Sequence, residues 1–139
     1  MEQNEGQATP VHPNPEAHEA DRREARLVKA FADYLDSREH DCIRHRILPP
    51  GETCALFTDL YAKGLSLLVE AKGSATRENI RMAIGQLADY SRFVSSKMRA
   101  ILLPSRPKDD LLDLAQNQKC AVIWPVGDGF ASTNPEALP

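Results

Sequence analysis

Three side chains in the middle of the chain have the chemistry needed to bind a metal ion and act on a phosphate. Asp59 precedes Glu70 and Lys72 by a short stretch of mostly apolar residues. Mg²⁺ prefers oxygen ligands and is usually held by one or two carboxylates, with waters and substrate phosphate completing its shell. An ammonium group beside such an ion could hold an attacking water and offset charge on the phosphorus oxygens. The three side chains therefore indicate metal-assisted phosphate chemistry.

Two adjacent strands would have to bring these side chains together. Apolar patterning predicts strands over 56–62 and 65–72. Lys63-Gly64 between them is typical of a two-residue hairpin loop, in which glycine readily adopts a positive φ. In that hairpin Ala62 would pair with Leu65.

The register of this hairpin decides whether a site exists. With the expected pairing, Asp59 and Glu70 are diagonal neighbours on one face, with Cβ atoms roughly 7–8 Å apart. Lys72 points to the same face, and the backbone carbonyl of Ala71 could add a third protein ligand. A slip of one residue would turn Asp59 and Glu70 to opposite faces.

The remaining chain predicts a layered domain. Helical periodicity predicts helices over 21–37, with Asp21 as N-cap, and over 75–95 and 109–118; strands are predicted over 42–48, 98–103 and 120–126. The order α-β-β-β-α-β-α-β predicts a mixed α/β (α+β) sheet domain. We expect the domain over 21–130, a flexible tail or linker over 1–20, and a C-terminal tail over 131–139.

Composition and charge permit a phosphate-bearing partner without requiring one. The 139 residues suit one domain, and their formal net charge is -3. Residues 1–21 contain five acids and no Lys or Arg, which leaves 17 basic and 15 acidic residues in 22–139. We expect no membrane span and no signal peptide. Three scattered cysteines without a Cys-x-x-Cys pair favour a cytoplasmic protein.

Asp59 followed by Glu70-Ala71-Lys72 on adjacent predicted strands resembles the motif of the PD-(D/E)xK nuclease superfamily. That superfamily has a restriction-endonuclease-like αβββαβ core, and its common Pro is replaced here by Thr58. Gln86 and Tyr90 lie on one face of the next predicted helix. They resemble the Gln-x-x-x-Tyr motif of RecB-like nucleases.

The resemblance implies a Mg²⁺-dependent deoxyribonuclease, with Mn²⁺ as a substitute. Asp59, Glu70 and the carbonyl of Ala71 would bind the metal, and Lys72 would assist the attacking water. Glu24 resembles the extra acidic residue that many members place near the metal.

Further residues would bind or position DNA. The resemblance implies that Gln86 and Tyr90 position either the substrate or the catalytic lysine. Arg77, Arg81 and Arg44 are candidates for phosphate contacts, since they lie on or beside the predicted elements of the site.

Several interpretations stay open. The expected protein is a DNA cleavage module of a restriction or defence system, with a separate reader domain and a possible homodimer. A catalytically inactive DNA-binding or assembly module, or a structure-specific junction resolvase, would have the same fold. The acids and lysine could also form solvated ion pairs across two strands. Gln86 and Tyr90 could be a polar helix edge, and Glu24 a surface residue.

Overall fold

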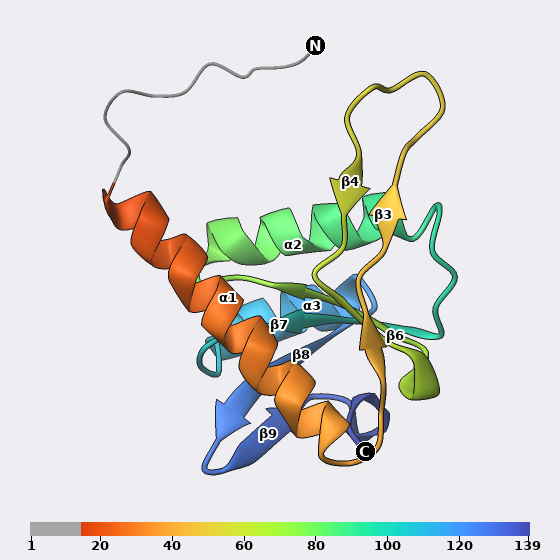
Figure 1. The fold of residues 1–139 in the computed structure, drawn as a ribbon. Helices are drawn as coiled ribbons and strands as arrows, with labels where there is room; N and C mark the ends of the chain where they lie inside the picture. Colours follow the sequence, from red (N-terminus) through yellow and green to blue (C-terminus); the bar gives the residue numbers. More distant parts are fainter. Residues whose placement is uncertain (1–14) are drawn as a thin grey trace.

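A mixed sheet lies between one helix on one face and two helices on the other (Figure 1). The computed structural model describes residues 15–139. The helices are α1 (Pro15–Asp36), α2 (Arg77–Tyr90) and α3 (Asp109–Asn117). The strands are β2 (Cys42–Ile43), β3 (Arg46–Ile47), β4 (Leu56–Phe57), β5 (Leu60–Ala62), β6 (Leu67–Ala71), β7 (Met98–Leu102), β8 (Cys120–Val126) and β9 (Gly129–Ser132). Two 3₁₀ helices are η1 (Lys63–Leu65) and η2 (Pro135–Ala137).

The six-stranded sheet has the order β2-β5-β6-β7-β8-β9. Strand β6 pairs antiparallel with β5 and parallel with β7, and β8 continues the parallel part before the β8–β9 hairpin. Strands β3 and β4 form a separate two-stranded arm that projects beyond the sheet (Figure 1). The expected mixed α/β class is confirmed.

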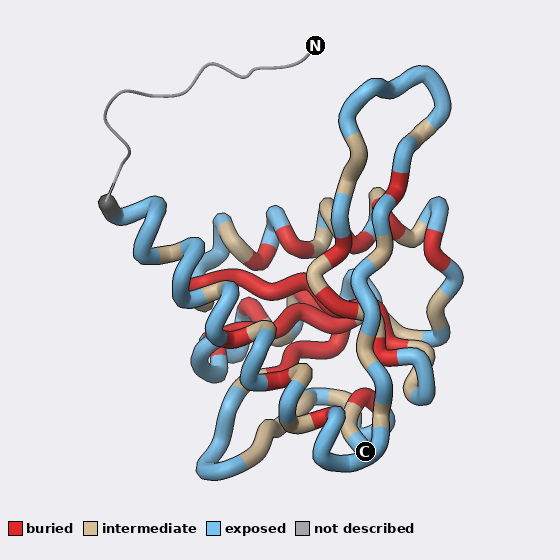
Figure 2. Tube along the Cα trace, in the orientation of Figure 1, coloured by how far each residue is buried: buried red, intermediate tan, exposed pale blue. Residues whose placement is uncertain are grey.

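Strand β6 is buried on both faces, as parallel strands covered by helices are. Its alternate residues Leu67 and Val69 pack toward α1, where Phe31 is also fully buried. Leu68 packs on the other face, with Ile80 of α2. Glu70 follows Leu68 by two residues and therefore faces α2. Figure 2 shows this buried centre running through the sheet.

The hairpin between β5 and β6 differs from the expected one. Ala62 pairs with Leu67, so four residues rather than two connect the strands. Ser66 supplies the left-handed conformation, with φ 51°. Gly64 is needed for space instead, because a Cβ there would lie 2.6 Å from Nδ1 of His40. The register moves by two residues, which leaves every side chain on its expected face.

Two expected strands are each divided between two sheets. The segment 42–48 forms β2 beside β5 and then β3 beside β4. The segment 56–62 forms β4 and then β5. Both breaks fall where the chain passes from the sheet to the arm. The interruption leaves Asp59 between the two strands, whereas Thr58 keeps a backbone hydrogen bond to His45.

Both ends of the folded region extend further than expected. Helix α1 begins at Pro15, so 15–20 is helical rather than tail, and Asp21 lies inside the helix instead of capping it. The rest of the expected N-terminal tail, 1–14, lies outside the described residues. After residue 130 the chain forms part of β9 and then η2, where Ala137 is fully buried in the core on the α1 face. Within 15–139, no helix is both long and apolar enough to span a membrane.

Candidate active site

Asp59 is held in place by the break between β4 and β5. The preceding Thr58 is fully buried, donates its N–H to the carbonyl of His45 at 3.0 Å, and accepts the N–H of His45 on Oγ1 at 2.9 Å. Oδ2 of Asp59 then accepts the N–H of Ala71 at 2.8 Å. The Asp59 carboxylate thus accepts the next hydrogen bond along β6, beyond the last residue of β6 that pairs with β5. Sequence reasoning missed the role of Thr58.

Glu70 and Lys72 are buried at the end of β6, with exposed fractions of only 4% and 5%. Nζ of Lys72 lies 3.8 Å from Oε2 of Glu70, which is an ion-pair distance rather than a hydrogen bond. Oε1 of Glu70 is buried without a hydrogen-bond partner. A buried oxygen of this kind is unfavourable unless another group binds it.

The pKa of Glu70 is raised by its surroundings. Burial raises its pKa to about 8, and the negative charge of nearby Asp59 acts in the same direction. The ammonium of Lys72 opposes the shift without cancelling it. At neutral pH, Glu70 therefore binds a proton unless additional positive charge is supplied.

Helix α1 brings Glu24 to the same place. Burial raises the pKa of Glu24, while Lys72 lowers it and Asp59 raises it, so the three groups interact. The helix is anchored beside the site because Nε of Arg23 donates to the carbonyl of Gly73 at 3.1 Å. A Cβ on Gly73 would lie 2.8 Å from the carbonyl oxygen of Ala20. Arg23, Ala20 and Gly73 were not expected to contribute, and only the glycine after Lys72 could have drawn attention to this contact.

Tyr90 is buried on α2 and lies near the acidic cluster, and half-buried Gln86 lies one turn before it. Their side chains are hydrogen bonded, and the pKa of Tyr90 is raised by burial and then by the charge of Glu70. Oε1 of Gln86 is buried without a partner. The structure therefore brings Tyr90 near Glu70, with Gln86 beside Tyr90.

The three candidate arginines have different surroundings. Arg44 donates Nε to the carbonyl of Thr58 at 3.0 Å, stacks over Phe57, and is close to Asp59. Arg77 is paired with Asp110 of α3, away from the carboxylates. Arg81 is exposed on α2 and forms no hydrogen bond or ion pair within residues 15–139. Only Arg44 lines the cleft beside the acids.

That cleft has a volume of about 430 Å³ and opens between α1 and the start of β5. Its lining residues are Asp21, Glu24, Ala25, Val28, Lys29, Arg44 and Asp59. Asp21 was expected only as a cap, although its spacing from Glu24 and Val28 places all three on one helix face. Glu70 and Lys72 do not line this cleft, but they interact electrostatically with two residues that do, Asp59 and Glu24.

The donor set for a metal is limited. Among residues 15–139, no three His, Cys, Asp or Glu side chains are arranged to hold a metal ion. Glu24 therefore does not complete a three-carboxylate group with Asp59 and Glu70. The available ligands are two carboxylates and the carbonyl of Ala71, whose N–H and C=O project toward the Asp59 side of β6.

Comparison of the chain with protein-family models, with curated proteins and with solved structures gives no match.

Proposed function

We propose that this chain is a Mg²⁺-dependent nuclease domain that hydrolyses phosphodiester bonds in DNA. The observation that carries the proposal is the meeting of Asp59, Glu70 and Lys72 at the end of β6, with Asp59 also lining an open cleft. The resemblance of these residues to the PD-(D/E)xK motif agrees with this chemistry. Tyr90 lies near Glu70 with Gln86 beside it, which further supports the proposal.

The residues fit a divalent cation. Glu70 has an unpartnered buried oxygen and a pKa of about 8 beside a second carboxylate, so the site lacks positive charge. Two carboxylates and the carbonyl of Ala71 suit Mg²⁺, which keeps several waters and takes substrate phosphate as a ligand. When bound, such an ion lowers the pKa of a coordinated water and withdraws charge from the phosphoryl oxygens.

The residues of the site then have distinct roles. The N–H of Ala71 fixes the orientation of Asp59. The ammonium of Lys72 orients the attacking water and offsets negative charge that develops on the phosphate. Gln86 holds the hydroxyl of Tyr90 at the inner wall of the site.

The substrate contact is centred on Arg44. Its guanidinium lines the cleft close to Asp59, where it binds a phosphate next to the scissile one. Arg81 supplies a more distant contact from α2. Because Arg77 already pairs with Asp110, it contributes less than expected to DNA binding.

Because the site has few basic residues, we favour a cleavage module whose DNA target is recognised by another domain. Nucleic-acid affinity depends strongly on the number of phosphate contacts. We therefore propose that a reader domain in a cytoplasmic restriction or defence system selects the DNA. A homodimer would place two sites on the two strands.

DNA cleavage by the purified chain tests the proposal. With Mg²⁺ or Mn²⁺, the protein should nick or degrade plasmid DNA, and Lys72→Met should lower the rate at least about a hundredfold. Lys63→Met is the matched control, because Lys63 is exposed at the other end of the same hairpin. Equal cleavage by Lys72→Met and Lys63→Met at unchanged melting temperature would refute the catalytic role.

The second candidate is an inactive DNA-binding or assembly module of the same fold. The contact between Nζ of Lys72 and Oε2 of Glu70 at 3.8 Å, which already engages the lysine, favours it. Titration calorimetry with Mn²⁺ separates the two candidates. Binding that Glu70→Gln removes supports the nuclease, whereas DNA binding without metal binding supports the inactive module.

A further inference from the structure

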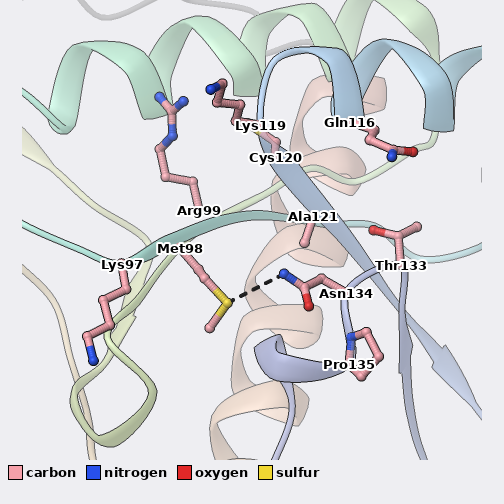
Figure 3. A pocket seen from close by; sticks show the side chains of 10 residues that line it. All are labelled: Lys97, Met98, Arg99, Gln116, Lys119, Cys120, Ala121, Thr133, Asn134 and Pro135. Atoms are coloured by element: carbon pink, nitrogen blue, oxygen red, sulfur yellow. Dashed lines mark hydrogen bonds between the residues drawn. The ribbon is translucent and has the colours of Figure 1, made fainter.

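A basic pocket lies at the opposite end of the parallel strands from the acidic cleft. Glu70 and Lys72 stand at the C-terminal end of β6, whereas this pocket adjoins the N-terminal ends of β7 and β8. Its volume is about 330 Å³, and its lining residues are Ser91, Val94, Ser95, Ser96, Lys97, Arg99 and Lys119. A neighbouring pocket of about 420 Å³ shares Lys97, Arg99 and Lys119 (Figure 3). Arg99 and Lys119, which line both pockets, form a basic wall between them.

The charges of this wall are not balanced by acids. Neither pocket is lined by any Asp or Glu. Within 15–139, none of the three cations forms an ion pair. Figure 3 shows Arg99 and Lys119 extending to the same side of β7, with Lys97 extending to the other side. Like charges that gather without a counter-charge repel each other, so an anion would stabilise them.

The partial negative charges at two helix C-termini neutralise only part of the positive charge of the basic residues. Helices α2 and α3 both end here, and each C-terminus has about half a negative elementary charge. Arg99 interacts with the C-terminus of α3, where it donates to the carbonyl of Gln118 at 3.2 Å. Two half charges together neutralise about one cation. Because Arg99 and Lys119 extend to the same side of β7, part of their combined positive charge is left for a ligand.

The hydroxyl groups of the pocket complete a donor set for an anion. Oγ of Ser91 is buried without a hydrogen-bond partner, and Ser95 and Ser96 also line the pocket. A buried hydroxyl normally has a partner, so the free one indicates a missing group. Lys119 also adopts φ 62°, at a helix end where glycine is usual. The chain keeps a cation at a position where its backbone would favour glycine.

We propose that the pocket lined by Ser91, Ser95, Ser96, Lys97, Arg99 and Lys119 is a binding site for a phosphate group. Its positive charge is not balanced by any lining acid, and serine hydroxyls with Arg and Lys are the donors that a phosphate takes. The phosphate belongs either to a free phosphate compound or to a nucleic-acid terminus. The inference is independent of the proposed nuclease activity, because it uses no residue of the acidic cleft.

Titration of the whole chain with inorganic phosphate, followed by amide NMR spectra, tests the proposal. Saturable shifts should appear at Ser91, at 95–99 and at Lys119, and the acidic cleft around Asp59 should not respond. Sodium chloride at matched ionic strength is the control for screening. The absence of saturable shifts at these positions would overturn the proposal.

Lys119→Gly separates binding from folding. Glycine tolerates the positive φ, so the variant should fold at least as stably while its Kd for phosphate rises about tenfold or more. The matched control is Lys108→Gln, which removes one charge from the exposed residue at the other end of α3. Equal Kd changes in both variants would reduce the site to general surface charge and overturn the proposal.

A second titration identifies the source of the phosphate. Short single-stranded DNA with and without a 5′-phosphate is compared with inorganic phosphate at the same residues. Stronger binding only when the terminal phosphate is present indicates a nucleic-acid end. Equal binding of inorganic phosphate and phosphorylated DNA indicates a free phosphate compound, and either result supports the pocket.

Discussion

The carboxylate of Asp59 accepts the backbone N–H of Ala71 at 2.8 Å. Backbone pairing between β5 and β6 ends at Leu60 and Val69, so this side chain supplies the hydrogen bond that β5 no longer makes. This bond places one acid beside Glu70, the neighbour of Ala71 in β6. It also makes the orientation of a candidate metal ligand part of the sheet. The site and the fold are consequently coupled at this residue.

Replacing Asp59 should reveal that coupling. Asp59→Ala leaves the N–H of fully buried Ala71 without a partner, which should lower the free energy of unfolding by about 1–3 kcal/mol. Asp59→Asn keeps an acceptor oxygen and should lose less, although both variants should lose metal binding. Urea denaturation measures the difference. Equal losses of stability would contradict the structural role of the bond.

Glu70 should make the protein less stable as the pH rises. Its folded-state pKa of about 8 lies above the ordinary value of 4.5, so the folded state binds the proton more strongly. Stability should therefore fall between about pH 4.5 and pH 8 without metal, by at most about 1.4 kcal/mol per pH unit, and level off above. The raised pKa of Glu24 acts with the same sign.

Urea denaturation in EDTA at several pH values checks this dependence. Glu70→Gln should flatten the slope and stabilise the protein at pH 8–9, because it removes the buried charge. Glu52→Gln, at an exposed position in the β3–β4 loop, is the control and should keep the wild-type slope. A slope shared by both variants would mean that Glu70 is not the group responsible.

Metal binding should release a proton. At pH 7 a carboxyl with a pKa of about 8 is roughly 90% protonated, and it must ionise to bind the ion. Calorimetric titration with Mn²⁺ in two buffers of different ionisation enthalpy should give a release of about 0.9 proton at pH 7 and much less at pH 9. Binding without proton release at pH 7 would place the ion away from Glu70.

Gly73 should be intolerant of a side chain. In Gly73→Ala the new Cβ would lie 2.8 Å from the carbonyl oxygen of Ala20, so α1 must move away from the site. We expect a loss of about 1–3 kcal/mol in unfolding free energy and weaker metal binding. Gly85→Ala is the control, since its Cβ meets nothing within 4 Å inside α2, and it should stabilise by up to about 1 kcal/mol.

The sequence was most informative where burial alone decides the structure. Strand β8 has its predicted bounds, and β6 follows from an apolar run that ends in Glu70 and Lys72. The hairpin loop was two residues longer than predicted, because η1 and Ser66 replace a tight turn. The prediction that Asp59 and Glu70 share a face survived because the error was an even number of residues.

Long-range contacts explain the features that were missed. No glycine or proline marks the break at Thr58, which depends on hydrogen bonds to His45 far along the chain. Local sequence also does not reveal that Ala20 packs on Gly73, so the start of α1 was placed too late. The polar segment after residue 130 carries little hydrophobic pattern, although Ala137 is buried in the core.

The way α1 sits against Gly73 has a practical consequence for anyone shortening this chain. A fragment cut at 21–130, the span that apolar patterning alone favours, would begin one residue after Ala20 and discard the first turns of the helix that presents Glu24. It would also discard the stretch that seats Ala137 under the sheet. Such a fragment is expected to be less stable and to hold Glu24 in a different position. A lack of activity in this fragment would therefore result from the truncation and would not test the proposed active site.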